Sequence, residues 1–92
     1  MQTLIFPGIS RDDKRWVDET ANNLKSNDTV RPFYWMHWTD ETNLFNAQEK
    51  AELIAKHLRG EKANIIAKDE GLEVANTLKK LIPEQIVSVI HN

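Results

Sequence analysis

Residues 63–71 have the sequence Ala-Asn-Ile-Ile-Ala-Lys-Asp-Glu-Gly, a short apolar run that passes directly into a polar turn. The run from Ala63 to Ala67 has the length of a buried strand, and apolar residues three and four positions apart follow the turn. This pattern predicts a strand–turn–helix unit with Asp69 at the turn. The rest of the chain repeats the alternation of strand and helix, so the sequence predicts an α/β fold.

The other predicted elements lie on both sides of this unit. Further strands are predicted at Thr3–Phe6, Thr29–Met36 and Ile86–Ile90, and the helices begin near Ser10–Asp13, Asn46 and Asp69–Gly71 and end at Ser26–Asp28, Gly60 and Pro83. Ser10–Asp13 and the pair Asn46 and Glu49 are predicted to cap their helices. The apolar faces are predicted from helical spacing: Trp16, Val17, Thr20, Ala21 and Leu24 in the first helix, Ala47, Ala51, Ile54, Ala55 and Leu58 in the second, and Val74, Ala75, Leu78 and Leu81 in the third.

Strands that alternate with helices predict right-handed crossovers and a parallel sheet. We expect one domain over residues 1–92: a Rossmann-like three-layer α/β/α sandwich with three helices and a four-stranded parallel sheet in the order 2-1-3-4. Pro32 places the second strand at an edge, because proline donates no hydrogen bond to a neighbouring strand. In this order Gly8–Ser10 and Asp69–Gly71 face each other at the switch point, where such folds place their sites.

Composition excludes several classes of function. The chain has 92 residues, 40% hydrophobic and 28% charged, with a net charge of -2 and no cysteine. This charge predicts no nucleic-acid partner, and the lack of cysteine excludes disulfides and thiolate chemistry. No apolar run approaches the roughly 18–20 residues of a membrane span. We expect a cytoplasmic protein without a membrane partner.

Two segments resemble loops of the α/β-hydrolase family. Phe6-Pro7-Gly8-Ile9-Ser10 is similar to the loop that supplies an oxyanion-hole N–H group, and Ile66–Gly71 is similar to the nucleophile elbow, Gly-x-Ser-x-Gly. The resemblance spans essentially the whole chain, as the first part of that fold, and implies a minimal α/β-hydrolase core. It also implies that Asp69 holds the nucleophile position, that the backbone N–H groups of Ile9 and Glu70 are the oxyanion donors, and that Gly71 is the elbow glycine.

Three departures from that family predict that the chain is not an enzyme. Ala67 and Asp69 stand where the elbow has its first glycine and its serine. The family's catalytic acid and histidine follow the strand at which this sequence stops, and His91 comes too early in chain order. The third helix carries polar residues, namely Glu70, Glu73 and Asn76, where the family is apolar or small. We expect a truncated, engineered or evolved non-catalytic scaffold with a vestigial elbow and oxyanion loop, which needs no cofactor, metal or partner.

Two other functions stay open from the sequence. One is a small hydrolase with Asp69 as its nucleophile, as the haloalkane-dehalogenase branch of the family implies. The other is a flavodoxin-like module that binds a ligand or a phosphoryl group. Asp12 and Asp13 together with Asp69 are similar to the acidic pocket of response-regulator receivers. Against both functions stands the interpretation of Asp69 as a helix N-cap and of Asp12 and Asp13 as helix-start charges.

The remaining candidates are a metal site, an aromatic cluster and a free sheet edge. His37, Asp40 and His91 are candidate metal ligands without a defined spacing. Residues 33–38 are either a ligand-binding cluster or a strand that packs one face in the core. We expect a monomer, with some self-association through the uncharged edge Ile86–Ile90.

Overall fold

The computed structural model describes residues 2–24, 29–35, 38 and 45–91 of the chain. Seven elements alternate along it, as predicted: β1 (Gln2–Phe6), α1 (Asp13–Asn23), β2 (Thr29–Pro32), α2 (Ala47–Leu58), β3 (Ala63–Ala67), α3 (Gly71–Leu81) and β4 (Ile86–His91). The bounds of β3 are those predicted from the sequence.

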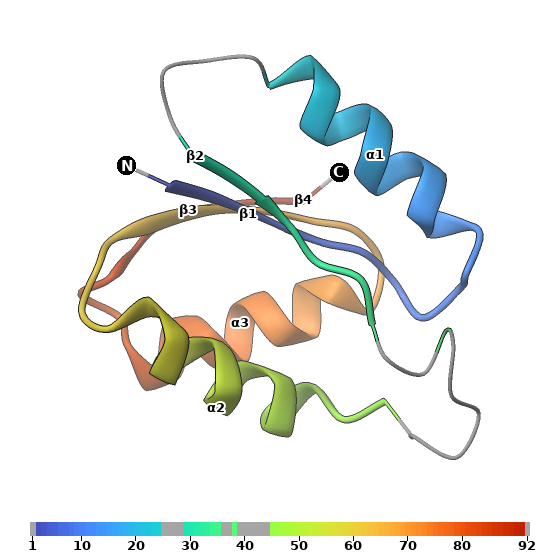
Figure 1. The fold of residues 1–92 in the computed structure, drawn as a ribbon. Coiled ribbons are helices and arrows are strands. Elements are labelled where there is room, and N and C mark those ends of the chain that lie inside the picture. The colour runs from blue at the N-terminus through green and yellow to red at the C-terminus, as the bar shows by residue number, and fades with distance from the viewer. Residues whose placement is uncertain (1, 25–28, 36–37, 39–44, 92) are drawn as a thin grey trace.

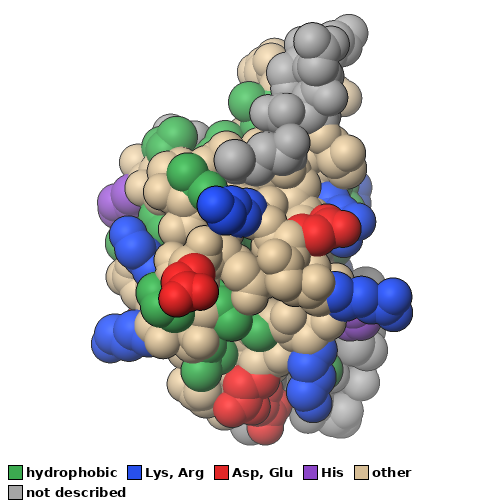
Figure 2. All heavy atoms as spheres, turned by 90° about the vertical axis from the view of Figure 1, so that its left-hand side faces the viewer, with side chains coloured by type: hydrophobic (Ala, Val, Ile, Leu, Met, Phe, Trp, Pro, Cys, Tyr) green, Lys and Arg blue, Asp and Glu red, His purple; other side chains and the backbone are tan. Residues whose placement is uncertain are grey.

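The four strands form one parallel sheet in the order β2-β1-β3-β4. Helix α1 covers one face of the sheet, whereas α2 and α3 lie together on the other (Figure 1). The three-layer fold and the strand order are therefore confirmed. All strand carboxyl ends meet at one side of the sheet, and the amino ends meet at the opposite side, where Lys and Arg side chains are spread over the surface (Figure 2).

Most of the core lies between the sheet and the pair α2 and α3. Leu4, Phe6 and Ile65 point to this side from the central strands, and they meet Ile54 and Leu78 of the two helices. The opposite face has a smaller apolar contact, in which Ile5 and Val17 are fully buried. Trp16, Thr20, Ala21 and Leu24 are only partly buried. The predicted apolar face of α1 thus has a single fully buried member, because α1 packs on β1 and β2 alone.

Helix α2 begins and ends as its sequence predicts. The Asn46 side chain accepts a hydrogen bond from the Glu49 N–H group at 3.0 Å, so the predicted cap is confirmed. At the other end Arg59 adopts a left-handed backbone with φ of 50°, and Gly60 follows with φ of 83°. These two residues turn the chain from α2 toward the amino end of β3.

Three predictions of local structure are wrong. The strand β2 ends at Pro32, although Phe33 still donates its N–H group to the Ile5 carbonyl at 3.0 Å. Asp12 occupies the N-cap position of α1 but makes no side-chain cap. Leu81, predicted on the apolar face of α3, is 42% exposed at the last residue of the helix.

The edge strand β4 contains an irregularity that the sequence did not predict. Ala63 pairs with Ile86 and Asn64 pairs with Ser88, so Val87 is an extra residue that bulges from the strand. A bulge bends an edge and makes it a poorer template for a further strand. None of the helices in the described part of the chain is long and apolar enough to cross a membrane.

Candidate functional site

The loops that follow β1 and β3 meet at the carboxyl side of the sheet, as predicted. The Ile9 N–H group donates to the Glu70 carboxylate, Oε1, at 2.9 Å, although the two residues are 61 positions apart. A second link ties the end of β1 to the same turn, because the Lys68 N–H group donates to the Phe6 carbonyl at 3.0 Å. The predicted apposition of Gly8–Ser10 and Asp69–Gly71 is confirmed.

The turn between β3 and α3 has an unusual backbone at Asp69. Its φ is 50°, in the left-handed region, and its side chain is exposed. A non-glycine residue pays about 1–2 kcal/mol for this conformation. Glu70, and not Asp69, occupies the N-cap position of α3. The interpretation of Asp69 as an N-cap or first-turn acid is therefore wrong, because Asp69 precedes the N-cap residue of α3.

Gly71 is required by the close approach of α3 to the end of β1. A Cβ atom at this position would lie 2.3 Å from the Phe6 carbonyl oxygen and 2.6 Å from the Pro7 carbonyl oxygen. Both neighbours are backbone, so neither moves without moving β1. This contact explains why the elbow glycine is present although the other two elbow residues differ from the family's pattern.

The Glu70 carboxylate accepts a hydrogen bond from the loop after β1, through the Ile9 N–H group at 2.9 Å. This bond is the largest cause that lowers the pKa of Glu70, to which the backbone of Glu70 itself adds a smaller effect, against a smaller opposing effect of burial. Ile9 is one of the two oxyanion donors that the resemblance implies. The structure therefore directs this donor at a side chain of the chain itself.

Asp13 holds the neighbouring part of the loop. It is buried, with 7% of its surface exposed, and its Oδ2 atom accepts from the Gly8 N–H group at 2.9 Å. Its Oδ1 atom lies 3.2 Å from the Lys68 ammonium. Asp13 is in the first turn of α1, as predicted, but its main contacts are to residues outside that helix.

Two of the three receiver-like acidic residues lie close together. Asp13 and Asp69 are both neighbours of Gly8, whereas Asp12 is exposed, and Asp13 forms an ion pair with Lys68. Among the described residues there is no group of three His, Cys, Asp or Glu side chains that could hold a metal ion. His37 and Asp40 lie outside the described residues. His91 ends β4 next to Ala67 of β3, so it lies at the same side of the sheet as Asp69.

Two tryptophans brace the loop after β1, which the sequence did not predict. Trp35 Nε1 donates to the Pro7 carbonyl at 2.9 Å, and Trp38 Nε1 donates to the Ile9 carbonyl at 2.7 Å. Arg11 in turn donates to the Trp38 carbonyl. Both tryptophans are buried, so core packing is the correct interpretation for this part of the aromatic cluster. No spacing in the sequence predicts this arrangement, because in a strand residues three positions apart point to opposite faces.

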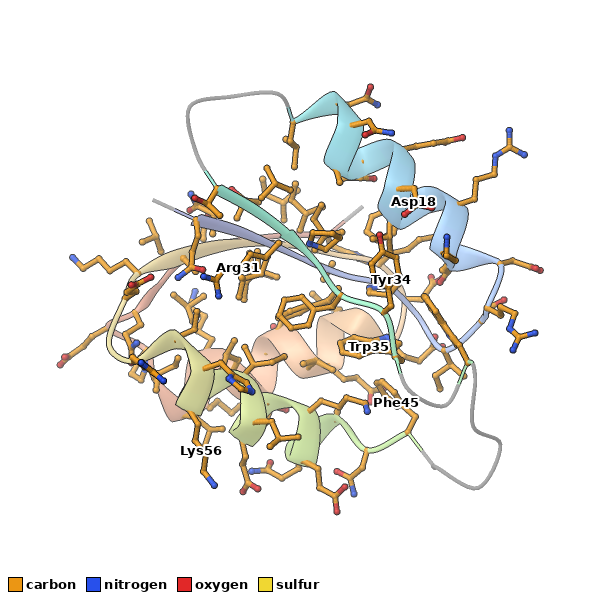
Figure 3. The ribbon with its side chains drawn as sticks, in the orientation of Figure 1. Asp18, Arg31, Tyr34, Trp35, Phe45 and Lys56 are labelled. Carbon is orange, nitrogen blue, oxygen red and sulfur yellow. The ribbon has the colours of Figure 1, made fainter. Side chains whose placement is uncertain are left out.

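The described aromatic residues on either side of these tryptophans divide between core and surface. Phe33 and Phe45 pack against Trp35, with ring centroids 6.1 and 5.8 Å away (Figure 3). Tyr34 is 46% exposed and donates to Asp18 Oδ1 of α1 at 2.6 Å. This bond raises the pKa of Tyr34 to about 12, and it lowers the pKa of Asp18, to which Lys14 adds a smaller effect.

The fold and this loop geometry define a small parallel α/β domain with an anion-binding turn at the carboxyl side of its sheet. Comparison of the chain with protein-family models, with curated proteins and with solved structures found no significant match.

Proposed function

We propose that this chain is a non-catalytic domain of the α/β-hydrolase type, in which the Glu70 carboxylate occupies the oxyanion site. The observation that carries the proposal is the hydrogen bond that the Ile9 N–H group donates to that carboxylate. Oxyanion donors act by stabilising negative charge that develops on the substrate in the transition state. A resident carboxylate satisfies them beforehand and repels a second anion.

The hydrolase-type part of the proposal rests on the turn after β3. In the nucleophile elbow a strained strand-to-helix turn exposes the nucleophile. Asp69 has the corresponding left-handed backbone and an exposed side chain. Gly71 allows α3 to approach the carbonyl groups of Phe6 and Pro7. These features support the proposal that this turn has the geometry of a nucleophile elbow, with Asp69 in the nucleophile position.

A second candidate, a hydrolase with Asp69 as the nucleophile, is favoured by one observation. Backbone strain often persists where function requires it, and Asp69 is a strained, exposed carboxylate. Such an enzyme would attack the carbon of a haloalkane with the Asp69 carboxylate, which forms an ester and releases the halide, and water activated by a histidine would then hydrolyse the ester to an alcohol and the free carboxylate. His91, at the end of the neighbouring strand β4, is the described histidine nearest to Asp69 in sheet register.

The experiment compares acylation of three variants by p-nitrophenyl acetate, with nitrophenol release and intact-protein mass as readouts. We expect no acyl-protein from Asp69→Ser alone, because Glu70 still occupies the donors. We expect stoichiometric acylation of Asp69→Ser combined with Glu70→Ala. The matched control combines Asp69→Ser with Glu73→Ala, which removes an exposed carboxylate from the first turn of α3 and leaves the donors occupied.

Two results would overturn the proposal. One is rapid acylation of Asp69→Ser with Glu70 in place. The other is turnover of an ester or a haloalkane by the unaltered protein that disappears in both Asp69→Asn and His91→Gln, which would establish the second candidate. The NMR titration of the Glu70 side chain gives an independent check, because the hydrogen bond from Ile9 should place its pKa below the ordinary value of a glutamate.

A further inference from the structure

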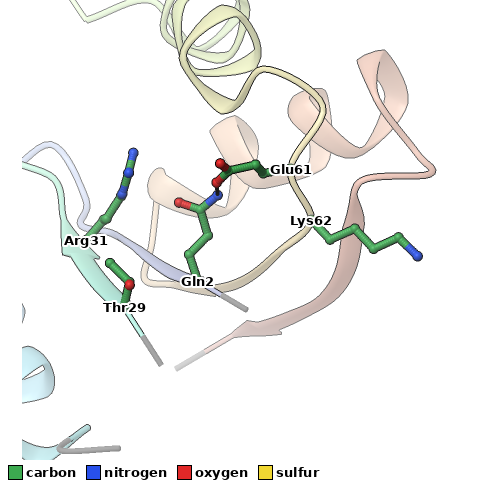
Figure 4. A pocket seen from close by; sticks show the side chains of 5 residues that line it. All are labelled: Gln2, Thr29, Arg31, Glu61 and Lys62. Atoms are coloured by element: carbon green, nitrogen blue, oxygen red, sulfur yellow. Dashed lines mark hydrogen bonds between the residues drawn. The ribbon is translucent and has the colours of Figure 1, made fainter. Parts of the chain in front are cut away.

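A groove crosses the amino side of the sheet, opposite the site described above. One cavity of about 360 Å³ is lined by Gln2, Thr29, Arg31, Glu61 and Lys62 (Figure 4). A second, of about 410 Å³, adjoins it, because Arg31 and Glu61 line both. Volumes of about 300–1,000 Å³ are typical of small-molecule sites. The groove lies between β2 and the segment that joins α2 to β3.

Gln2 is the polar residue at the bottom of this groove. Only 5% of its surface is exposed. Its Nε2 atom donates to Glu61 Oε2 at 3.1 Å, which fixes the orientation of the amide. The amide oxygen then points to the side of Arg31 and Thr29 (Figure 4), and this buried oxygen has no hydrogen-bond partner among the described residues. A buried acceptor without a donor costs about 1–3 kcal/mol, so a bound molecule that supplies a donor here gains affinity.

The charge of the groove favours an anion. Arg31, Arg59 and Lys62 line it and form no ion pair with any described residue. The carboxylate in the same groove, Glu61, is engaged by Gln2. The guanidinium of Arg31 presents a planar fork of donors, which matches a carboxylate or phosphate group better than an ammonium does. Arg31 extends from β2 toward α2, into the space between them (Figure 3).

We propose that this groove binds a small hydroxylated oxyanion, such as a polyol phosphate or a hydroxy acid. The anionic group lies against the Arg31 guanidinium, and a hydroxyl group next to it donates to Gln2 Oε1, which points to the same side (Figure 4). Thr29, the neighbour of Gln2 in sheet register, adds a hydroxyl at the same end. This site is independent of the function proposed for the carboxyl side of the sheet.

The test is a titration of the protein followed by amide NMR shifts, with glycerol 3-phosphate, glycerate, inorganic phosphate and glycerol at constant ionic strength. We expect glycerol 3-phosphate to shift the resonances of Gln2 and Arg31 and to bind roughly three- to tenfold more tightly than inorganic phosphate, which is the value of one hydrogen bond. Glycerol should not bind. Glycerate distinguishes a site for carboxylates from one that prefers phosphates, and binding of either supports the proposal.

Three variants assign the effect to residues. Arg31→Gln, at an exposed position, should weaken the binding of glycerol 3-phosphate and of inorganic phosphate about tenfold or more. This is the loss expected for a charged hydrogen bond of roughly 1.5–3 kcal/mol. Gln2→Met should reduce the affinity for glycerol 3-phosphate to that for inorganic phosphate. Lys56→Gln is the matched control, because Lys56 points away from the groove on the outer side of α2 (Figure 3) and its loss should change nothing.

The proposal is overturned if none of the anions shifts the amide resonances of Gln2 or Arg31. It is also overturned if Lys56→Gln weakens anion binding as much as Arg31→Gln does. Equal affinity of the unaltered protein for glycerol 3-phosphate and inorganic phosphate also overturns it, because Gln2 then contributes nothing. Arg31 is exposed, so its variant keeps the fold and the test stands even if Gln2→Met does not fold.

Discussion

Individual residues decide how closely the two loops at the carboxyl side can meet. Gly71 leaves room for the backbone of β1, Asp69 takes a left-handed conformation, and Glu70 closes the gap to Ile9. Each of these residues serves a contact that is distant in the chain. The site is therefore built from steric and hydrogen-bonding requirements that no short stretch of sequence contains.

The glycines test two different requirements. Gly71→Ala should lower the free energy of unfolding by about 3 kcal/mol or more, because the new methyl group meets the backbone carbonyls of Phe6 and Pro7. Gly60→Ala should cost only about 1–2 kcal/mol, because its surroundings are open and only its φ of 83° is unfavourable. Urea unfolding followed by tryptophan fluorescence measures both. Equal losses would mean that α3 shifts to accept the methyl group.

At the scale of elements, α1 is joined to the chain after β2 by Tyr34 and Asp18. The tyrosine hydroxyl donates to the carboxylate, and the Lys14 ammonium lies 3.0 Å from the other carboxylate oxygen and 5.7 Å from the centre of the tyrosine ring. This cluster lies at the surface, on the side of α1 that faces the β2 segment (Figure 3).

The pH dependence of this link has a definite sign. The folded protein raises the pKa of Tyr34 from 10.0 to about 12, so the stabilising effect of the hydrogen bond is complete below pH 10 and is lost as the pH rises toward 12. We expect Tyr34→Phe to be less stable than the unaltered protein near neutral pH, and the difference to shrink over that alkaline range. The free energy of unfolding of both proteins, measured across this pH range, checks the prediction. A difference in stability that persists above pH 12 would contradict it.

The same bond sets the acidity of Asp18. Tyr34→Phe should raise the pKa of Asp18, measured by NMR, because the hydrogen bond from the tyrosine is the largest single cause of its lowering. An unchanged pKa of Asp18 in Tyr34→Phe would show that the tyrosine bond is weak in solution.

The sequence predicted elements better than it predicted their connections. The strand β3 and the cap of α2 were predicted correctly, because an apolar run and an Asn-x-x-Glu pattern are local signals. The strand β2 was predicted too long, because its aromatic residues suit a strand and also suit the core. Asp13 was predicted as a helix-start charge, whereas its partners Gly8 and Lys68 come from two other segments. The donors Ile9 and Glu70 were predicted, but their occupation by a carboxylate depends on three-dimensional contact.

At the scale of the whole molecule, the sheet is covered unequally. Helix α1 packs on β1 and β2, and no described helix lies over the same face of β3 and β4. Ile5, Ile66 and Ile90 are neighbours in register on this face, and their exposure increases outward, from fully buried Ile5 to Ile90 at 55% exposed. An apolar strip therefore ends at the free edge of β4.

This strip predicts weak self-association at high protein concentration, through β4 of two copies. Ile90→Lys should abolish the association, because a charge at an edge opposes pairing. Leu53→Lys is the matched control, since Leu53 of α2 is equally exposed, at 56%, but lies away from the edge. Sedimentation velocity over a concentration series measures the effect. Association that survives in Ile90→Lys and disappears in Leu53→Lys would assign the contact to α2.

The central position of β1 also determines how the sheet can assemble. This strand is flanked by β2 on one side and by β3, residues 63–67, on the other. Every pairing in the sheet closes a long loop, and such non-local pairings form slowly. A chain in which β3 has not yet docked holds β1 with one side unpaired, so the sheet is completed only when segments far apart in the sequence have come together.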